Sequence, residues 1–304
     1  MQFQALGFSA HPGARVKIAL IGDLHGAWDD WDAQYFDQSD YDYLLFTGDL
    51  GSGTGAAGVQ VARSIARLGK PVFLIPGNND VEYQPEIEAE FSHQEGLIRI
   101  LEAGGGQRNS AMSRSVGQVK VCGFSQHLLQ LSSGNVTLVA GRPHSMGGPN
   151  LSFVEHMRRN YGVDSLSASA DRLIELVEQT QTEDLLFLSH NGPHGLGSLP
   201  ADPWGCDFRE AGGDWGDSDL SAALEHAGKI GKRVLAVVAG HMHWRTRGGE
   251  LRLSQVRRGG VLFVNPAQVP RIFSSPDGPI RSHLCLQLGE GEVQCKEVKV
   301  VSDR

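Results

Sequence analysis

Carboxylate, amide and imidazole side chains follow five short apolar segments of the sequence, and each of the five groups has a glycine within two residues. In chain order they are Asp23 with His25, Asp49, Asn78, His190, and His241 with His243. In open α/β sheets, ligands collect just beyond the carboxyl ends of the strands. Glycine lets the backbone approach a ligand closely. We therefore expect the seven side chains to meet in one place.

The spacing and the types of these donors indicate metal binding. Residues i and i+2 of an extended segment point the same way, so Asp23 with His25, and His241 with His243, can each aim two donors at one point. Mixed oxygen and nitrogen donors suit Mn²⁺, Fe, Zn²⁺ or Ni²⁺, whereas Ca²⁺ prefers oxygen alone. One carboxylate can bridge two ions about 3.5 to 4 Å apart, and such a pair activates water and stabilises charge on phosphate.

The elements that must position these donors are predicted from hydrophobic patterns. Short apolar runs rich in β-branched residues predict strands at 16–21, 43–46, 72–75, 119–124, 136–140, 185–188, 234–239, 261–264 and 284–288. Helical periodicity occurs at 59–66 and 166–177. Strands that alternate with helices predict a layered α/β fold with largely buried sheets. After residue 261 the helical patterns stop, and we expect hairpins that close a second sheet.

A long connection interrupts this pattern. Residues 192–219 exceed an ordinary loop, and loops longer than about 12 to 15 residues are usually functional or disordered. Trp204 and Trp215 favour an ordered lid or substrate loop. Tryptophan more often anchors such a loop by burial than stacks on a substrate ring. We find no repeat and no low-complexity linker, so one domain over residues 1–304 is the simpler expectation.

Composition narrows the function further. The 304 residues are 40% hydrophobic and carry a formal charge of −8, which provides no broad basic face for nucleic acid. Residues 1–15 show no signal-peptide pattern, and no apolar run is long enough to span a membrane. We therefore expect a cytoplasmic protein with a small phosphorylated substrate and no nucleic-acid or membrane partner. The sequence does not specify an oligomeric state.

The five blocks resemble the calcineurin-like metallophosphoesterases, whose pattern is DxH, GD, GNH followed by an acid, a lone His, and GHxH. The resemblance covers roughly residues 16–270 and extends to an Asn-Pro turn, at Asn265, of compact bacterial-type members. It implies a four-layer αββα sandwich of two mixed β-sheets flanked by helices, with two divalent metal ions, for which we favour Mn²⁺. It assigns Asp23, His25 and His243 to one metal, Asn78, His190 and His241 to the other, and Asp49 to the bridge.

One position departs from the family pattern. Asn79 stands where the family usually has a histidine, and an amide can donate a hydrogen bond but does not titrate near neutral pH. We expect Asn78 and Asn79 to donate hydrogen bonds to phosphate and the substrate to be a phosphodiester sooner than a phosphomonoester. His144 and His194 are candidates for an outside acid. Arg142 is predicted either to clamp a substrate phosphate or to form a salt bridge.

These observations predict a phosphoesterase in which a metal-bridging hydroxide attacks the phosphorus of a small phosphate ester. Asp80 is expected to orient its neighbours without binding metal. The alternatives are a phosphomonoesterase or protein phosphatase of the same fold, and a non-catalytic binding module. Because all seven proposed ligands are present, the binding module is disfavoured. A nuclease would need a basic track for the nucleic-acid backbone.

Overall fold

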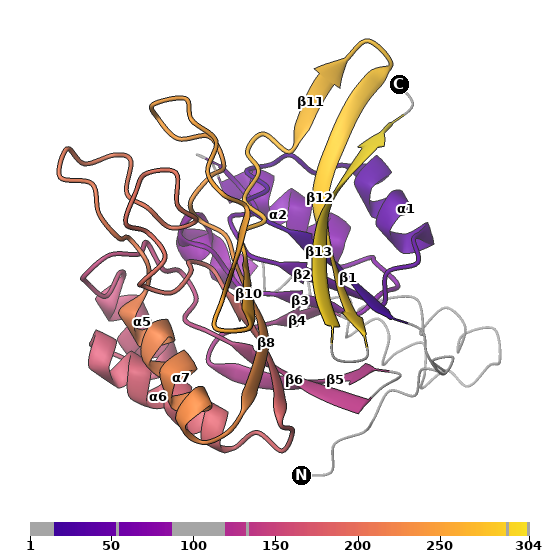
Figure 1. Ribbon diagram of the computed structural model, residues 1–304. Coiled ribbons are helices and arrows are strands. Elements are labelled where there is room, and N and C mark those ends of the chain that lie inside the picture. The colour runs from indigo at the N-terminus through magenta and orange to yellow at the C-terminus, as the bar shows by residue number, and fades with distance from the viewer. Residues whose placement is uncertain (1–14, 53–54, 87–118, 132–133, 290–291, 303–304) are drawn as a thin grey trace.

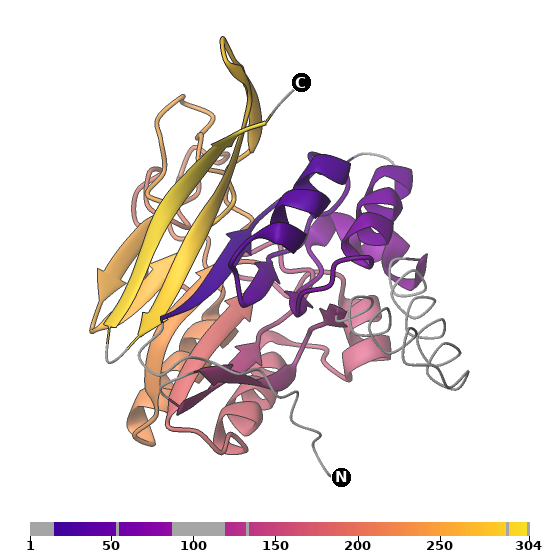
Figure 2. The same ribbon diagram turned by 90° about the vertical axis from the view of Figure 1, so that its right-hand side faces the viewer.

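A computed structural model describes residues 15–52, 55–86, 119–131, 134–289 and 292–302, and two β-sheets packed face to face form its centre (Figures 1 and 2). The first sheet has the strand order β11-β12-β1-β2-β3-β4, with β13 also paired to β12. Its strands are β1 (Val16–Ile21), β2 (Tyr43–Phe46), β3 (Val72–Leu74), β4 (Val119–Val121), β11 (Ile272–Ser275), β12 (Gly278–Gly289) and β13 (Glu292–Val301). The strands β1 to β4 are parallel, whereas β12 runs antiparallel to β1.

The second sheet has the order β5-β6-β7-β8-β10-β9. Its strands are β5 (Ser125–Leu131), β6 (Gly134–Ala140), β7 (Asp184–Ser189), β8 (Arg233–Ala239), β9 (Gln255–Arg258) and β10 (Val261–Val264). The four inner strands are parallel, and the two edge strands are antiparallel to their neighbours. Both sheets are therefore mixed, as predicted.

Helices cover the outer face of each sheet (Figure 1). They are α1 (Asp30–Gln38), α2 (Gly55–Ile65), the short 3-10 helix η1 (Asn78–Tyr83), α5 (Val154–Tyr161), α6 (Leu166–Glu178) and α7 (Ser218–Lys229). Along β2, Leu45 belongs to the core between the sheets, whereas Leu44 and Phe46 pack toward α1 and α2. A third core lies between the second sheet and α5, α6 and α7. This arrangement confirms the predicted four-layer αββα sandwich.

The hairpins at the end of the chain differ from the expectation. The strand β12 pairs with β1, from Val16 opposite Leu288 to Leu20 opposite Leu284, so these hairpins extend the first sheet and the predicted assignment to the second was wrong. Leu284 and Leu286 enter the core between the sheets while Cys285 faces the helices. A strand that is buried on both faces has a continuous apolar sequence whichever sheet it joins. The hydrophobic pattern of β12 therefore could not show which of the two sheets it belongs to.

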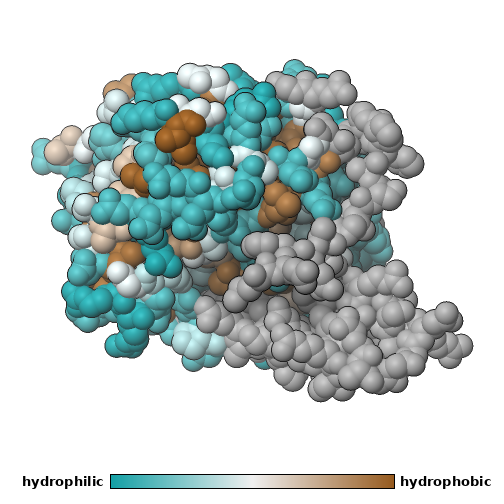
Figure 3. Space-filling view, turned by 90° about the horizontal axis from the view of Figure 1, so that it is seen from below, coloured by the Kyte–Doolittle hydropathy of each residue, from teal (hydrophilic) through white to brown (hydrophobic). Residues whose placement is uncertain are grey.

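Two further features concern the surface. Within the described ranges, no helix is both long and apolar enough to cross a lipid bilayer. The face seen from below shows mainly hydrophilic residues with separate hydrophobic ones among its described part (Figure 3). Separate apolar residues of this kind are normal on folded proteins and need no partner to cover them.

Candidate metal centre

The seven predicted donors lie at the carboxyl ends of β1, β2, β3, β7 and β8. Four of them have a backbone in the left-handed region, with φ of 46° at Asp23, 45° at His25, 52° at Asp49 and 69° at His241. Asp and His tolerate this conformation better than most residues. The chain therefore turns sharply after β1, β2 and β8, so these donors do not continue along extended strands as the sequence reasoning assumed.

One group of donors comprises Asp23, His25 and His243, whose ligand atoms all lie within 4.8 Å of one another. The Nε2 atoms of the two histidines are 3.0 Å apart, and His243 Nε2 lies 3.5 Å from Asp23 Oδ2. That carboxylate oxygen is buried and has no hydrogen-bond partner among the described residues. An isolated buried carboxylate is costly unless a cation compensates it, so the donor set fits a metal ion.

A second group surrounds His190. Its Nδ1 donates to the Thr47 carbonyl at 2.6 Å, which directs Nε2 to Asn78 Oδ1 at 2.9 Å. Its ring packs edge-on against His241, with centroids 5.1 Å apart. Burial lowers the pKa of His190, but Asp49 and other carboxylates outweigh that effect and raise it. The same negative field would attract a metal cation.

Asp49 lies between the two groups. Its Oδ2 is 3.8 Å from His25 Nε2, and its Oδ1 is 3.7 Å from His190 Nε2. The Asn79 backbone N–H donates to Oδ1 at 2.8 Å, and the Asn79 amide donates to Oδ2 at 2.7 Å. Each carboxylate oxygen is thus held in place and faces one group of donors, an orientation suited to a bridging ligand. In this structure Asn79 orients Asp49, and its predicted bond to phosphate stays a prediction.

Asp80 joins the loops that follow β2 and β3. Its carboxylate accepts from the backbone N–H groups of Asp49 and Gly77, both at 2.8 Å, and of Leu50 at 2.9 Å. Burial and the neighbouring Asp49 raise its pKa to about 7. These contacts agree with the expected orienting role. Gly77 is needed there because a Cβ on it would lie 2.2 Å from Asp49 Oδ1.

The two candidate acids occupy different environments. His144 is buried, with Nδ1 2.7 Å from the Gly77 carbonyl and Nε2 2.9 Å from Gln84 Oε1. Burial lowers its pKa to about 3, so the geometry favours positioning of Gly77 over proton donation. His194 is exposed, and its backbone bonds to Asp217 and Ser221 within the 192–219 segment and the helix that follows it. Neither substrate role is tested by this arrangement.

Arg142 lies in a buried ion cluster. Its guanidinium is 2.8 Å from Asp217 Oδ1 and 2.7 Å from Asp219 Oδ2. Asp217 also accepts from the Ser145 hydroxyl at 2.7 Å. The salt bridge that the sequence left open is therefore present and fully buried, while contact with a substrate phosphate stays a prediction. The cluster fixes the end of the 192–219 segment to the loop after β6.

The 192–219 segment wraps around the ends of β7 and β8. Trp204 is fully buried, and its indole N–H donates to the Gly240 carbonyl at 3.2 Å. Asn191 donates from its amide to the Trp215 carbonyl at 3.0 Å. The indole N–H of Trp215 donates to the Met146 carbonyl at 2.7 Å. The Thr47 carbonyl orients the His190 ring, and no sequence signature could have revealed that contact.

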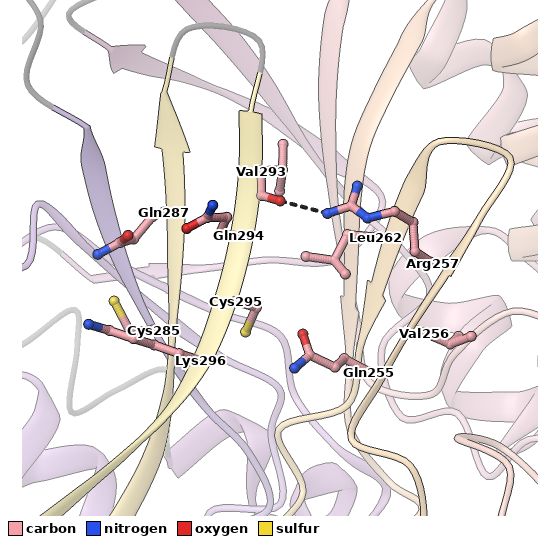
Figure 4. A pocket seen from close by; sticks show the side chains of 10 residues that line it. All are labelled: Gln255, Val256, Arg257, Leu262, Cys285, Gln287, Val293, Gln294, Cys295 and Lys296. Carbon is pink, nitrogen blue, oxygen red and sulfur yellow. Dashed lines mark hydrogen bonds between the residues drawn. The ribbon is translucent and has the colours of Figure 1, made fainter.

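A pocket of about 400 Å³ lies away from these donors, between β9–β10 and β12–β13 (Figure 4). Its lining includes Arg257, Leu262 and Cys295, together with several glutamines. The Arg257 guanidinium crosses the gap between the sheets and donates to the Val293 carbonyl at 2.6 Å. None of the seven predicted ligands lines it, so this pocket and the candidate metal centre are separate.

A two-sheet sandwich with histidine, aspartate and asparagine donors at its strand ends has the architecture of a metal-dependent phosphoesterase. The family model described as calcineurin-like phosphoesterase matches residues 16–245, and the chain belongs to that family. Comparison with curated proteins gave no significant match.

Solved structures show the same fold. The crystal structure of TT1561 of Thermus thermophilus is 12% identical, with a TM-score of 0.52 over 93% of this chain and 99% of that one. Vacuolar Protein Sorting 29 from Cryptosporidium parvum is 15% identical, with a TM-score of 0.34 over 95% and 99%. A predicted phosphoesterase from Streptococcus pneumoniae is 10% identical, with a TM-score of 0.31 over 94% and 99%. The fold comparison rests on the first of these.

Proposed function

We propose that the protein hydrolyses a small phosphodiester with two divalent metal ions, held by the seven donors as the sequence predicts. The observation that carries this proposal is the position of Asp49, whose two oxygens face His25 on one side and His190 on the other at 3.8 and 3.7 Å. Mixed imidazole, amide and carboxylate donors suit Mn²⁺ and related ions. When bound, such a pair would supply a water of lowered pKa and positive charge for the phosphate oxygens.

The residues of the chain would fix the geometry of this reaction. Asn79 and Asp80 hold Asp49 through its side chain and its backbone N–H, respectively. Thr47 fixes the ring of His190 through Nδ1. Hydrogen bonds of this kind set the orientation of a ligand, and their loss typically costs about 10- to 100-fold in metal affinity or activity. Preorganised donors avoid rearrangement when charge develops on phosphate.

The phosphodiester preference rests on two residues beside the centre, Asn79 and His144, neither of which supplies a proton to the leaving group. Asn79 cannot transfer a proton near neutral pH, and the pKa of about 3 leaves His144 neutral. A substrate with a good leaving group needs no such donor. The chain carries a formal charge of −8, so a small anionic ester would bind only where positive charge is concentrated locally. A nucleic acid would need positive charge over a broad surface, and we therefore expect no nucleic-acid substrate.

Hydrolysis of bis-p-nitrophenyl phosphate and p-nitrophenyl phosphate after chelation and readdition of Mn²⁺ tests the proposal. We expect metal-dependent turnover, faster for the diester, and about two metal ions per chain by elemental analysis. Asp49→Asn and His241→Asn should each lower kcat/KM more than about 100-fold, because loss of a ligand exceeds the effect of a supporting residue. Asn also suits the left-handed backbone at both positions.

Matched controls change the same residue types elsewhere. Asp40 forms a surface ion pair with Lys17, and His226 pairs with Glu178 on the outer helices. Asp40→Asn and His226→Gln should retain both metal content and turnover. A chain that binds two metal ions yet hydrolyses neither compound would count against the diesterase proposal, and failure to bind metal would leave a binding module.

A further inference from the structure

Two aromatic side chains near the candidate metal centre, Trp215 and Phe208, each have an arginine guanidinium over the ring. The Trp215 indole N–H donates to the Met146 carbonyl at 2.7 Å, and the Trp215 carbonyl accepts at 3.0 Å from the amide of Asn191, the residue that follows the proposed ligand His190. Phe208 meets Trp215 edge-on, with ring centroids 5.0 Å apart. The Arg209 guanidinium lies over Trp215 at 4.2 Å from the ring centroid, and the Arg247 guanidinium lies over Phe208 at 5.7 Å.

Each arginine is held by its neighbours in the chain. The 192–219 segment contacts the chain that follows β8, where the Arg247 backbone N–H donates to Asp207 at 2.7 Å. The Arg209 carbonyl accepts from Gly212 at 3.0 Å in a tight turn. Stacking on an aromatic ring restricts a guanidinium while leaving its N–H edge free to donate.

Arg209 and Arg247 are both exposed residues, and neither forms an ion pair with any residue that the structure describes. Most other arginines near this end of the fold are engaged: Arg142 with Asp217 and Asp219, and Arg252 with Asp207 and several backbone carbonyls. In a chain of charge −8, two neighbouring arginines without a carboxylate partner among the described residues form a local site for an anion.

We propose that Arg209 and Arg247 bind a second anionic group of the substrate, a phosphate or carboxylate distinct from the phosphodiester held at the metal centre. This inference rests on the proposed function and specifies its substrate class as a small phosphodiester with an additional negative charge. Trp215 links the two sites: its carbonyl accepts from Asn191, which follows His190, and the Arg209 guanidinium lies over its ring. The substrate would span the distance from the donors to the guanidinium pair.

The test uses p-nitrophenyl phosphodiesters with a common leaving group. Their second ester group is an alkyl chain of about two to four carbons that ends in a methyl, a carboxylate or a phosphonate. With the Mn²⁺-loaded protein, we expect at least one anionic chain to exceed its methyl analogue about 10-fold in kcat/KM through a lower KM, the effect of one or two charge-assisted hydrogen bonds at a partly exposed site. High salt should reduce the preference.

The variants Arg209→Gln and Arg247→Gln should each weaken the preference, and the double variant should bring the ratio of anionic to methyl substrate close to one. Arg233→Gln removes the same charge from an exposed ion pair with Asp184, where β7 and β8 begin, and should leave the ratio unchanged. Turnover of all substrates without a preference for any anionic chain would overturn the anion site alone, as would a preference that survives in the double variant. If no ester is hydrolysed, the proposed function itself fails.

Discussion

The buried Arg142 cluster permits a prediction of stability that also decides the role of this residue. Replacement of Arg142 by glutamine would remove the only cation that pairs with Asp217 and Asp219 among the described residues, at side chains that are 2%, 1% and 0% exposed. Removal of one partner from a buried ion pair costs about 3 to 5 kcal/mol, because a charge stays behind uncompensated. We expect urea unfolding of the metal-free variant at pH 8 to show a loss of that size.

The pH dependence provides a second, independent signature. Burial and Asp219 raise the pKa of Asp217 to about 6 even though Arg142 lowers it, so removal of Arg142 should raise that pKa further. When the pKa of a carboxyl group is raised in the folded state, the folded chain takes up a proton that the unfolded chain does not. The free energy of unfolding of the protein therefore rises as the pH falls through that pKa. The difference in free energy of unfolding between the parent and Arg142→Gln should therefore become smaller by about 1 to 2 kcal/mol when the pH is lowered from 8 to 5.5.

Arg158→Gln is the matched control, because its ion pair with Glu155 has a length of 2.7 Å, like that of Arg142 with Asp219, but is 53% and 82% exposed. Surface pairs contribute about 0 to 1 kcal/mol, so this variant should unfold almost as the parent does. An Arg142→Gln deficit below about 1 kcal/mol, or one that is equal at both pH values, would refute the reasoning from burial. Normal stability combined with a raised KM for phosphodiesters would instead support the alternative role as a phosphate clamp.

Two further predictions concern other positions. Gly77→Ala should displace Asp49, because the added Cβ would lie 2.2 Å from its Oδ1 and 2.5 Å from its N; metal content and turnover should fall while circular dichroism is retained, and Gly228→Ala, which has open space in α7, should change neither. His283 is buried, its Nε2 lies 2.7 Å from the Tyr41 hydroxyl, and burial with the nearby Arg271 lowers its pKa to about 3. Below pH about 6.5 only the unfolded chain takes up a proton at His283, which lowers the free energy of unfolding as the pH falls. His283→Gln should therefore reduce this decline by about 1.4 kcal/mol per pH unit. If urea unfolding at several pH values between 6.5 and 5 shows the same decline in the variant and the parent, the assignment is contradicted.

The gathering of the donors in the candidate metal centre was the most predictable part of the molecule. Its donors follow strands whose apolar runs are visible in the sequence, and β1, β2 and β10 begin and end at the predicted residues. Neighbouring parallel strands carry their carboxyl ends to one edge of each sheet. Pattern alone therefore predicted that the donors gather, and the contacts between His25, Asp49 and His190 are consistent with it.

Other elements had weaker signals. The strand β13 intersperses charged and polar residues among its valines, such as Lys299 between Val298 and Val300, so no long apolar run marks it. In α7, Leu220, Ala223 and Ala227 do have helical spacing, but the preceding long loop masked the start of the helix. The burial of Arg142 and the arginine–aromatic cluster depend on contacts between distant segments. No local pattern encodes such contacts, so they required the structure.

The left-handed backbone at four donors narrows the residues that those positions can accept. Asp23, His25, Asp49 and His241 must satisfy a conformational and a chemical requirement at once. A β-branched replacement would strain the turn as well as remove a donor, whereas asparagine would lose only part of the coordination chemistry. Drift among related chains should therefore pass through Asn, Asp, His and Gly at these sites. If related chains carry only Asn, Asp, His or Gly at these four positions, that restriction would indicate the left-handed turn even in members that no longer bind metal.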